Sequence, residues 1–147
     1  MKNESEILNF QSNSEKETES IAYNISKNVK EGDVICFFGD VGAGKTVFTR
    51  GLCRGLGFEG YVNSPSYIVM NIYKTDTISI YHYDLYRIGS TAELNEIGFY
   101  EFAGQEKSVT IVEWAEMLDG ELPDNRIEIR ITAPDEKKRE IMIKRVN

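Results

Sequence analysis

The chain has 147 residues, of which 41% are hydrophobic and 28% charged, and this length predicts a single domain over residues 1–147. The formal net charge of −7 argues against a protein that binds nucleic acid by itself, because neutralising phosphates requires a basic surface. The same balance disfavours attachment to an anionic membrane surface, and no run of about 18 apolar residues predicts a membrane span.

The N-terminal residues and the cysteines indicate a cytoplasmic protein. Residues 1–16 are polar and acidic and lack the apolar centre of a secretory signal. Cys36 and Cys53 lie in apolar stretches without metal-ligand spacing. We expect two buried thiols in a reducing compartment, with a disulfide between them as the less favoured alternative.

The first third of the chain predicts a helix, a strand and a second helix. Ser14 and Glu17 form a capping box, and apolar residues then recur at helical spacing, which predicts a helix over about residues 15–30. Residues 33–38 (DVICFF) form a continuous apolar run, typical of a strand buried on both faces. A second helix is expected from Gly44 to about Leu56, where Gly57 ends it.

The remaining residues predict strands, hairpins and one more helix. We expect a hairpin of strands 67–73 and 77–84, a helix over 91–102 and a buried strand over 108–113. Residues 126–132 and 139–146 alternate strictly and predict a closing hairpin. The expected fold is α/β: a P-loop NTPase-like sandwich whose central mixed β-sheet has flanking helices and a C-terminal antiparallel hairpin.

Residues 39–46 (GDVGAGKT) fit the phosphate-loop pattern G-x-x-x-x-G-K-[ST] between a predicted strand and a predicted helix. Glycines let successive backbone N–H groups face one anion, and the helix directs its positive end at the phosphates. Lys45 should reach the β and γ phosphates, and the Thr46 hydroxyl should hold Mg²⁺. The guanine-reading motif N-K-x-D is absent, which favours ATP. The predicted nucleotide-binding residues are Gly39, Asp40, Val41, Gly42, Ala43, Gly44, Lys45 and Thr46.

Two carboxylates stand at the ends of predicted strands, where ligand sites of α/β proteins form. Asp84 ends the run 78–83, and Glu113 ends the run 109–112. Such acids hold the metal of a bound nucleotide or orient the attacking water, and the residues alone leave the division of these roles open. His82 lies on the same strand face as Asp84. Arg87 follows three residues after Asp84 and is a candidate to complement phosphate charge.

Five blocks of the sequence, in this order, resemble the bacterial TsaE family. They are residues 40–46 (DVGAGKT), 49–52 (TRGL), 63–67 (NSPSY), 82–87 (HYDLYR) and 112–116 (VEWAE). The phosphate loop is generic, whereas the H-x-D-x-Y-R and E-W blocks at these distances are specific. Two positions depart from the family pattern: Ser66 replaces the usual Thr, and Val41 replaces the usual Leu.

The resemblance implies a cytoplasmic, Mg²⁺-dependent P-loop ATPase that works with the TsaD–TsaB pair. That pair transfers threonylcarbamoyl to adenosine 37 of tRNAs that read ANN codons, and ATP hydrolysis would reset it. The tRNA would be reached only through this complex. By position, Lys45 and Thr46 have the phosphate and metal roles, Glu113 a metal role, and Asp84 a Walker-B-like or water-positioning role. Candidate partner or switch contacts are Ser66, His82, Tyr86, Arg87 and Trp114.

Two other functions share the same phosphate loop. A small-molecule kinase would pass the γ-phosphate to a metabolite, but it usually needs a basic lid, and residues 56–87 contain only Lys74 and Arg87 as basic residues. A module that senses ATP without turnover would not need both Asp84 and Glu113. The ATPase is therefore the favoured prediction.

Overall fold

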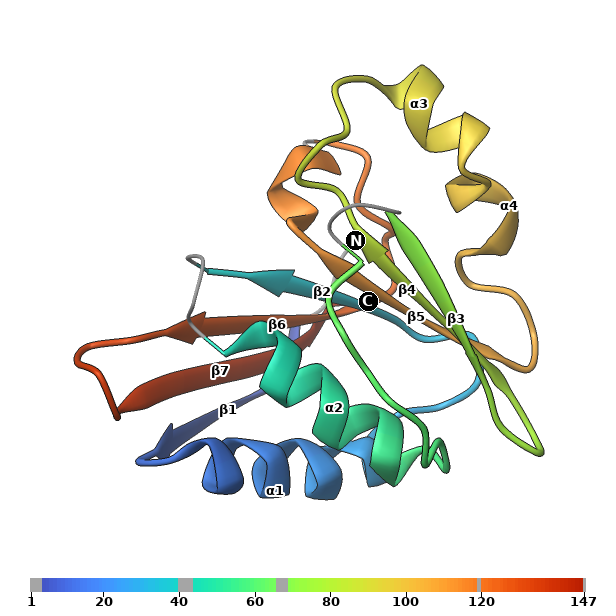
Figure 1. Cartoon of the computed structure of the whole chain (residues 1–147). Helices are drawn as coiled ribbons and strands as arrows, with labels where there is room; N and C mark the ends of the chain where they lie inside the picture. The colour runs from blue at the N-terminus through green and yellow to red at the C-terminus, as the bar shows by residue number, and fades with distance from the viewer. Residues whose placement is uncertain (1–3, 40–43, 66–68, 119, 147) are drawn as a thin grey trace.

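A computed structural model describes residues 4–39, 44–65, 69–118 and 120–146. Within these residues, seven strands form one mixed sheet in the order β1-β7-β6-β2-β5-β4-β3 (Figure 1). The strands are β1 (Glu4–Ser12), β2 (Val34–Phe38), β3 (Met70–Lys74), β4 (Ser79–Asp84), β5 (Ser108–Glu113), β6 (Arg126–Thr132) and β7 (Arg139–Val146). The helices are α1 (Glu15–Ile25), α2 (Lys45–Gly55), α3 (Thr91–Glu96) and α4 (Phe99–Phe102), with 3₁₀ turns η1 (Ser26–Asn28) and η2 (Ala115–Leu118).

The centre of the sheet is parallel and its edges are antiparallel. β2 pairs in parallel with β5 and β6, and β4 pairs in parallel with β5. β3, β7 and β1 add antiparallel pairs at the two edges. The predicted α/β fold with a mixed sheet and a C-terminal hairpin is confirmed. The β4–β5 register pairs Asp84 with Glu113, so the two predicted acids end neighbouring strands.

Helices cover both faces of the sheet. α1 and α2 pack on one face, where Phe48 and Leu52 meet Ile35 and Phe37 of β2. On the other face, α3, α4 and η2 cover Val34 and neighbouring side chains (Figure 1). All five residues of β2 are buried, as the continuous apolar run predicts.

The first helix begins where its capping box predicts. Ser14 Oγ accepts a hydrogen bond of 3.1 Å from the backbone N–H of Glu17, and Glu17 Oε2 accepts one of 2.9 Å from the N–H of Asn13. The helix ends at Ile25 rather than near residue 30, and η1 follows. The predicted helix over 91–102 is two short helices, because Gly98 with φ +76° ends the first.

Strand β1 and turn η2 were not predicted from the sequence. β1 is an edge strand that pairs only with β7, and Ile7, Asn9 and Gln11 are exposed, so the segment lacks the continuous apolar run of a buried strand. The start predicted for β3 was wrong at Val69, whose φ of 72° is left-handed, and residues 67 and 68 lie outside the described part of the chain.

The two cysteines are buried free thiols, as predicted. Burial raises the pKa of Cys36 and of Cys53 to about 12, which keeps both sulfurs protonated and unreactive at neutral pH. No helix in the described ranges is long and apolar enough to cross a membrane.

Candidate nucleotide site

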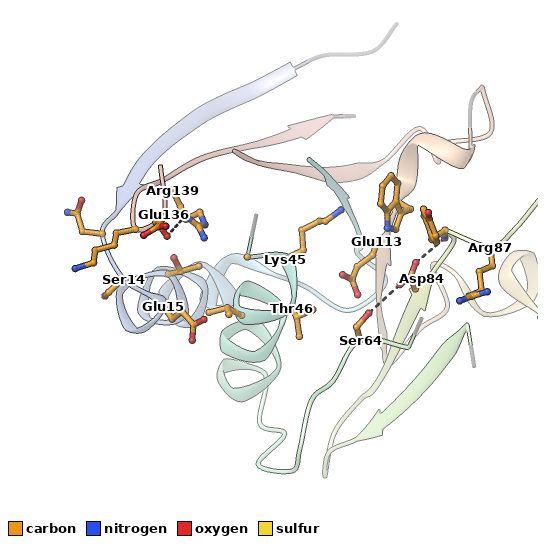
Figure 2. Close-up of a pocket in the computed structure, with 17 residues that line it drawn as sticks. Ser14, Glu15, Lys45, Thr46, Ser64, Asp84, Arg87, Glu113, Glu136 and Arg139 are labelled. Atoms are coloured by element: carbon orange, nitrogen blue, oxygen red, sulfur yellow. Dashed lines mark hydrogen bonds between the residues drawn. The ribbon is translucent and has the colours of Figure 1, made fainter. Parts of the chain in front are cut away.

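A pocket of about 910 Å³ opens where β4 and β5 end and α2 begins. Figure 2 shows Lys45 and Thr46 between Asp84 and Glu113 on one side and residues of α1 and the β6–β7 turn on the other. Pockets for small ligands span roughly 300–1,000 Å³, so this one is large enough for a nucleotide. The fold therefore brings the second half of the predicted phosphate loop and both predicted acids into one cavity.

The start of α2 leaves an anion site open. Gly44 precedes the helix with φ +104°, and no side chain in the described part of the chain caps the helix N-terminus. The first backbone N–H groups of the helix thus remain available for an anion, next to the positive end of the helix dipole. Gly39 directly follows β2 with φ +132°, and a Cβ there would collide with the Ile131 carbonyl, so glycine is required. Asp40, Val41, Gly42 and Ala43 lie outside the described residues.

The Lys45 side chain lies at the head of α2 and is held from two sides. Its Nζ donates a hydrogen bond of 2.9 Å to the Gly39 carbonyl and lies 4.5 Å from the centre of the Trp114 ring. The residue is only 6% exposed, so its charge is largely removed from water. Thr46 is half-buried and lines the pocket beside it. A phosphate would offer the ammonium a stronger partner than a carbonyl does.

Backbone and loop contacts orient Asp84. Its Oδ1 accepts a hydrogen bond of 2.9 Å from the Tyr86 backbone N–H, and its Oδ2 accepts one of 3.3 Å from Ser64 Oγ (Figure 2). The Asp84 backbone N–H donates to the Val69 carbonyl at 2.8 Å. The carboxylate is nearly buried and lines the pocket, so its position is set before any ligand arrives.

Glu113 is paired with the only histidine of the chain. His82 Nε2 lies 2.6 Å from Glu113 Oε2, and His82 is fully buried. His82 therefore reaches the pocket through Glu113 rather than by an exposed surface of its own. No group of three or more His, Cys, Asp or Glu side chains within the described ranges could hold a metal ion alone. The Thr46 hydroxyl and the carboxylates in the pocket fit Mg²⁺, which takes few protein oxygens and completes its shell with phosphates and water.

Trp114 and Tyr86 form an aromatic rim beside the acids. Trp114 has φ +59°, which is uncommon for a residue other than glycine. The centroid of its ring lies 4.8 Å from the centroid of the Tyr86 ring. Tyr86 is 59% exposed, and Arg87 also lines the pocket. These three predicted contact residues therefore lie together at the mouth of the pocket. Ser66 lies outside the described residues.

The far half of the pocket was not predicted. It is lined from the start of α1 and from the β6–β7 turn by Ser14, Glu15, Thr18, Glu136, Lys137 and Arg139. Arg139 Nη1 donates to the carbonyls of Asp135, Glu136 and Lys138 at 3.1, 3.2 and 2.9 Å, which holds the turn. No local signal joins residues so far apart in the sequence, because only the pairing of β1 with β7 brings them together.

Comparison with known proteins finds one family. The family model described as "Threonylcarbamoyl adenosine biosynthesis protein TsaE" matches residues 12–141. The chain is 38% identical over 136 residues to the tRNA threonylcarbamoyladenosine biosynthesis protein TsaE of Rickettsia typhi, covering 92% of this chain and 93% of that one. It is 40% identical over 126 residues to the Bacillus subtilis protein of the same name, covering 85% and 77%. The crystal structure of Bacillus subtilis YdiB matches with a TM-score of 0.77 and 34% identity, covering 97% and 87%.

Proposed function

The chain belongs to the TsaE family, and we propose that it acts in tRNA threonylcarbamoyladenosine biosynthesis as a Mg²⁺-dependent ATPase. The observation that carries the proposal is the composition of one pocket. An uncapped helix N-terminus, Lys45 and Thr46 face two carboxylates that end neighbouring parallel strands. This is the set of groups that phosphoryl transfer to water requires.

Each side chain has a role in this proposal. Lys45 leaves the Gly39 carbonyl and binds the β and γ phosphates, and the first N–H groups of α2 bind the same anion. Thr46 and Glu113 would hold Mg²⁺, which would supply positive charge against the charge that develops on the phosphates. Asp84, held by the Tyr86 N–H and the Ser64 hydroxyl, orients the attacking water. Hydrolysis then needs no covalent intermediate on the protein.

The unpredicted half of the pocket supports the proposal that a whole nucleotide binds there, rather than phosphate alone. The volume between α1 and the β6–β7 turn continues directly from the phosphate-binding end at Gly44 and Lys45. Arg139 offers a guanidinium plane and Glu136 a carboxylate there. Planar cations stack on aromatic rings, and carboxylates accept hydrogen bonds from ribose hydroxyls. We therefore assign this half to the base and ribose.

The TsaD–TsaB complex is the proposed partner, and its contribution rests on the family resemblance. The exposed Tyr86 ring and its neighbour Trp114 adjoin both acids, so a protein bound there would respond to the state of the nucleotide. The acidic net charge supports docking on protein, with tRNA reached only through the complex. A cytoplasmic location follows from this assignment, since ATP and tRNA are its substrate and its pathway's target.

The proposal is tested by incubating purified protein with ATP and Mg²⁺, alone and with the TsaD–TsaB complex, and measuring released phosphate. We expect release that the complex stimulates. Binding of ATP with no phosphate release in either condition would instead support the sensing module. Transfer of the γ-phosphate to a metabolite hydroxyl, with no free phosphate, would support the kinase.

A further inference from the structure

A row of buried hydrogen bonds, here called the Tyr73 relay, runs from β3 through β4 to the end of β5. Tyr73 Oη lies 3.0 Å from His82 Nδ1, and His82 Nε2 lies 2.6 Å from Glu113 Oε2. Tyr73 is 5% exposed, His82 0% and Glu113 4%. The three side chains come from adjacent strands, so the sheet itself sets the spacing of the row.

We propose that Tyr73 and His82 are positioning residues that hold the Glu113 carboxylate in the orientation needed to bind the metal of the nucleotide. This inference rests on the proposed function of the pocket. His82 Nε2 is hydrogen-bonded to Glu113 Oε2, which leaves the second carboxylate oxygen of Glu113 for the pocket that this residue lines. Without that bond the glutamate could rotate away, since its side chain has three rotatable torsions.

The relay also reaches the second acid through the loop after α2. Tyr73 Oη donates a hydrogen bond of 3.1 Å to the Asn63 carbonyl, and Asn71 Nδ2 donates to the same carbonyl at 3.3 Å. The next residue, Ser64, donates through Oγ to Asp84 Oδ2 at 3.3 Å. Both acids are therefore tied to one short loop segment, residues 63–64, and their separation depends on it.

If Tyr73 only packed in the core, removal of its hydroxyl would leave Mn²⁺ affinity unchanged. Its ring packs against Phe58, with centroids 4.8 Å apart, and this contact survives when only the hydroxyl is removed. Burial raises the pKa of Tyr73, so the hydroxyl keeps the one proton that it donates to the Asn63 carbonyl, and its oxygen is left to accept from His82 Nδ1. Partners of this kind orient metal ligands, and their loss typically weakens metal binding about 10- to 100-fold.

The test compares Tyr73→Phe with Tyr83→Phe. Tyr83 is likewise a buried tyrosine, on the neighbouring strand β4, but its hydroxyl has no hydrogen-bond partner among the described residues, so its loss is a matched control. We would measure Mn²⁺ affinity by electron paramagnetic resonance with ADP bound, which excludes turnover. Tyr73→Phe should weaken Mn²⁺ binding by about tenfold, at the lower end for such partners, while ADP affinity without metal stays unchanged. Tyr83→Phe should change neither.

A second variant keeps the test decisive if Tyr73→Phe does not fold. His82→Gln retains an amide N–H for Glu113 but loses the link to Tyr73, so its Mn²⁺ affinity should also fall. In a Glu113→Gln background, Tyr73→Phe should add no further loss. Equal Mn²⁺ affinities for Tyr73→Phe and Tyr83→Phe, or full additivity with Glu113→Gln, would refute the relay. A wild-type protein that binds ADP and Mn²⁺ but never hydrolyses ATP would refute the proposed function and leave the relay standing.

Discussion

Replacing Lys45 by alanine removes the one buried cation at the head of α2. In the structure its ammonium bonds the Gly39 carbonyl and lies over the Trp114 ring, so its loss leaves no partner charge unpaired. The fold should therefore survive the change, with a stability loss near the value of one hydrogen bond, about 1 kcal/mol.

Nucleotide binding should suffer more than stability does. A charge-assisted contact between an ammonium and phosphate contributes about 1.5–3 kcal/mol, and 1.4 kcal/mol is a factor of ten. The affinity of Lys45→Ala for ATP should thus fall by about 10- to 150-fold. Hydrolysis should fall further, because negative charge on the phosphates is redistributed in the transition state.

The assay is isothermal titration calorimetry with ATP, supported by Trp114 fluorescence. Trp114 is the only tryptophan and lies over Lys45, so its emission should change on binding in the wild type. Lys74→Ala is the matched control, because Lys74 is an exposed lysine on β3 that does not line the pocket. An ATP affinity of Lys45→Ala within about threefold of the control would refute the phosphate-loop assignment.

Three further outcomes are expected. Asp84→Asn and Glu113→Gln should bind nucleotide nearly as well as wild type but hydrolyse it slowly. In a phosphate-release assay, extra Mg²⁺ should restore hydrolysis only in Glu113→Gln. Rescue of Asp84→Asn instead would assign the metal role to Asp84 and the water-positioning role to Glu113. In titrations of labelled protein, the TsaD–TsaB complex should bind the ATP-bound protein about 5- to 150-fold more tightly than the ADP-bound protein. The tRNA alone should bind weakly and dissociate as salt is added. Equal affinities of the complex for the two nucleotide states would contradict a role of ATP hydrolysis in resetting the complex. Stability should fall at alkaline pH, because Cys36 and Cys53 ionise near their ordinary pKa of 9.0 when unfolded but near 12 when folded. The unfolded state then binds fewer protons, and each thiol should cost about 1.4 kcal/mol per pH unit above pH 9, measured by urea unfolding under reducing conditions; a flat profile up to pH 11 would contradict their burial.

Much of the pocket around Gly44 and Lys45 could be predicted because its signals are local. The β2 run is apolar at every position, Gly44 and Lys45 open a helix directly after it, and Asp84 and Glu113 each end an apolar strand. Strand ends and helix starts follow from residue types a few positions apart, and parallel strands present their carboxyl ends at one edge of the sheet. The sequence therefore determined the fold class and which side chains would meet in the pocket.

Other features depend on contacts between residues that are distant in the chain. β1 becomes a strand only because β7 pairs with it, and that pairing brings Ser14 toward Arg139 to build the far half of the pocket. The bond between His82 and Glu113 depends on the β4–β5 register, which offsets along the sequence do not reveal. Tyr73 joins them because an antiparallel hairpin pairs it with Ile80, which lies two residues before the buried histidine on the same face of β4. Tertiary packing alone decides these contacts, since hydrogen bonds between strands depend on spatial neighbours rather than on sequence spacing.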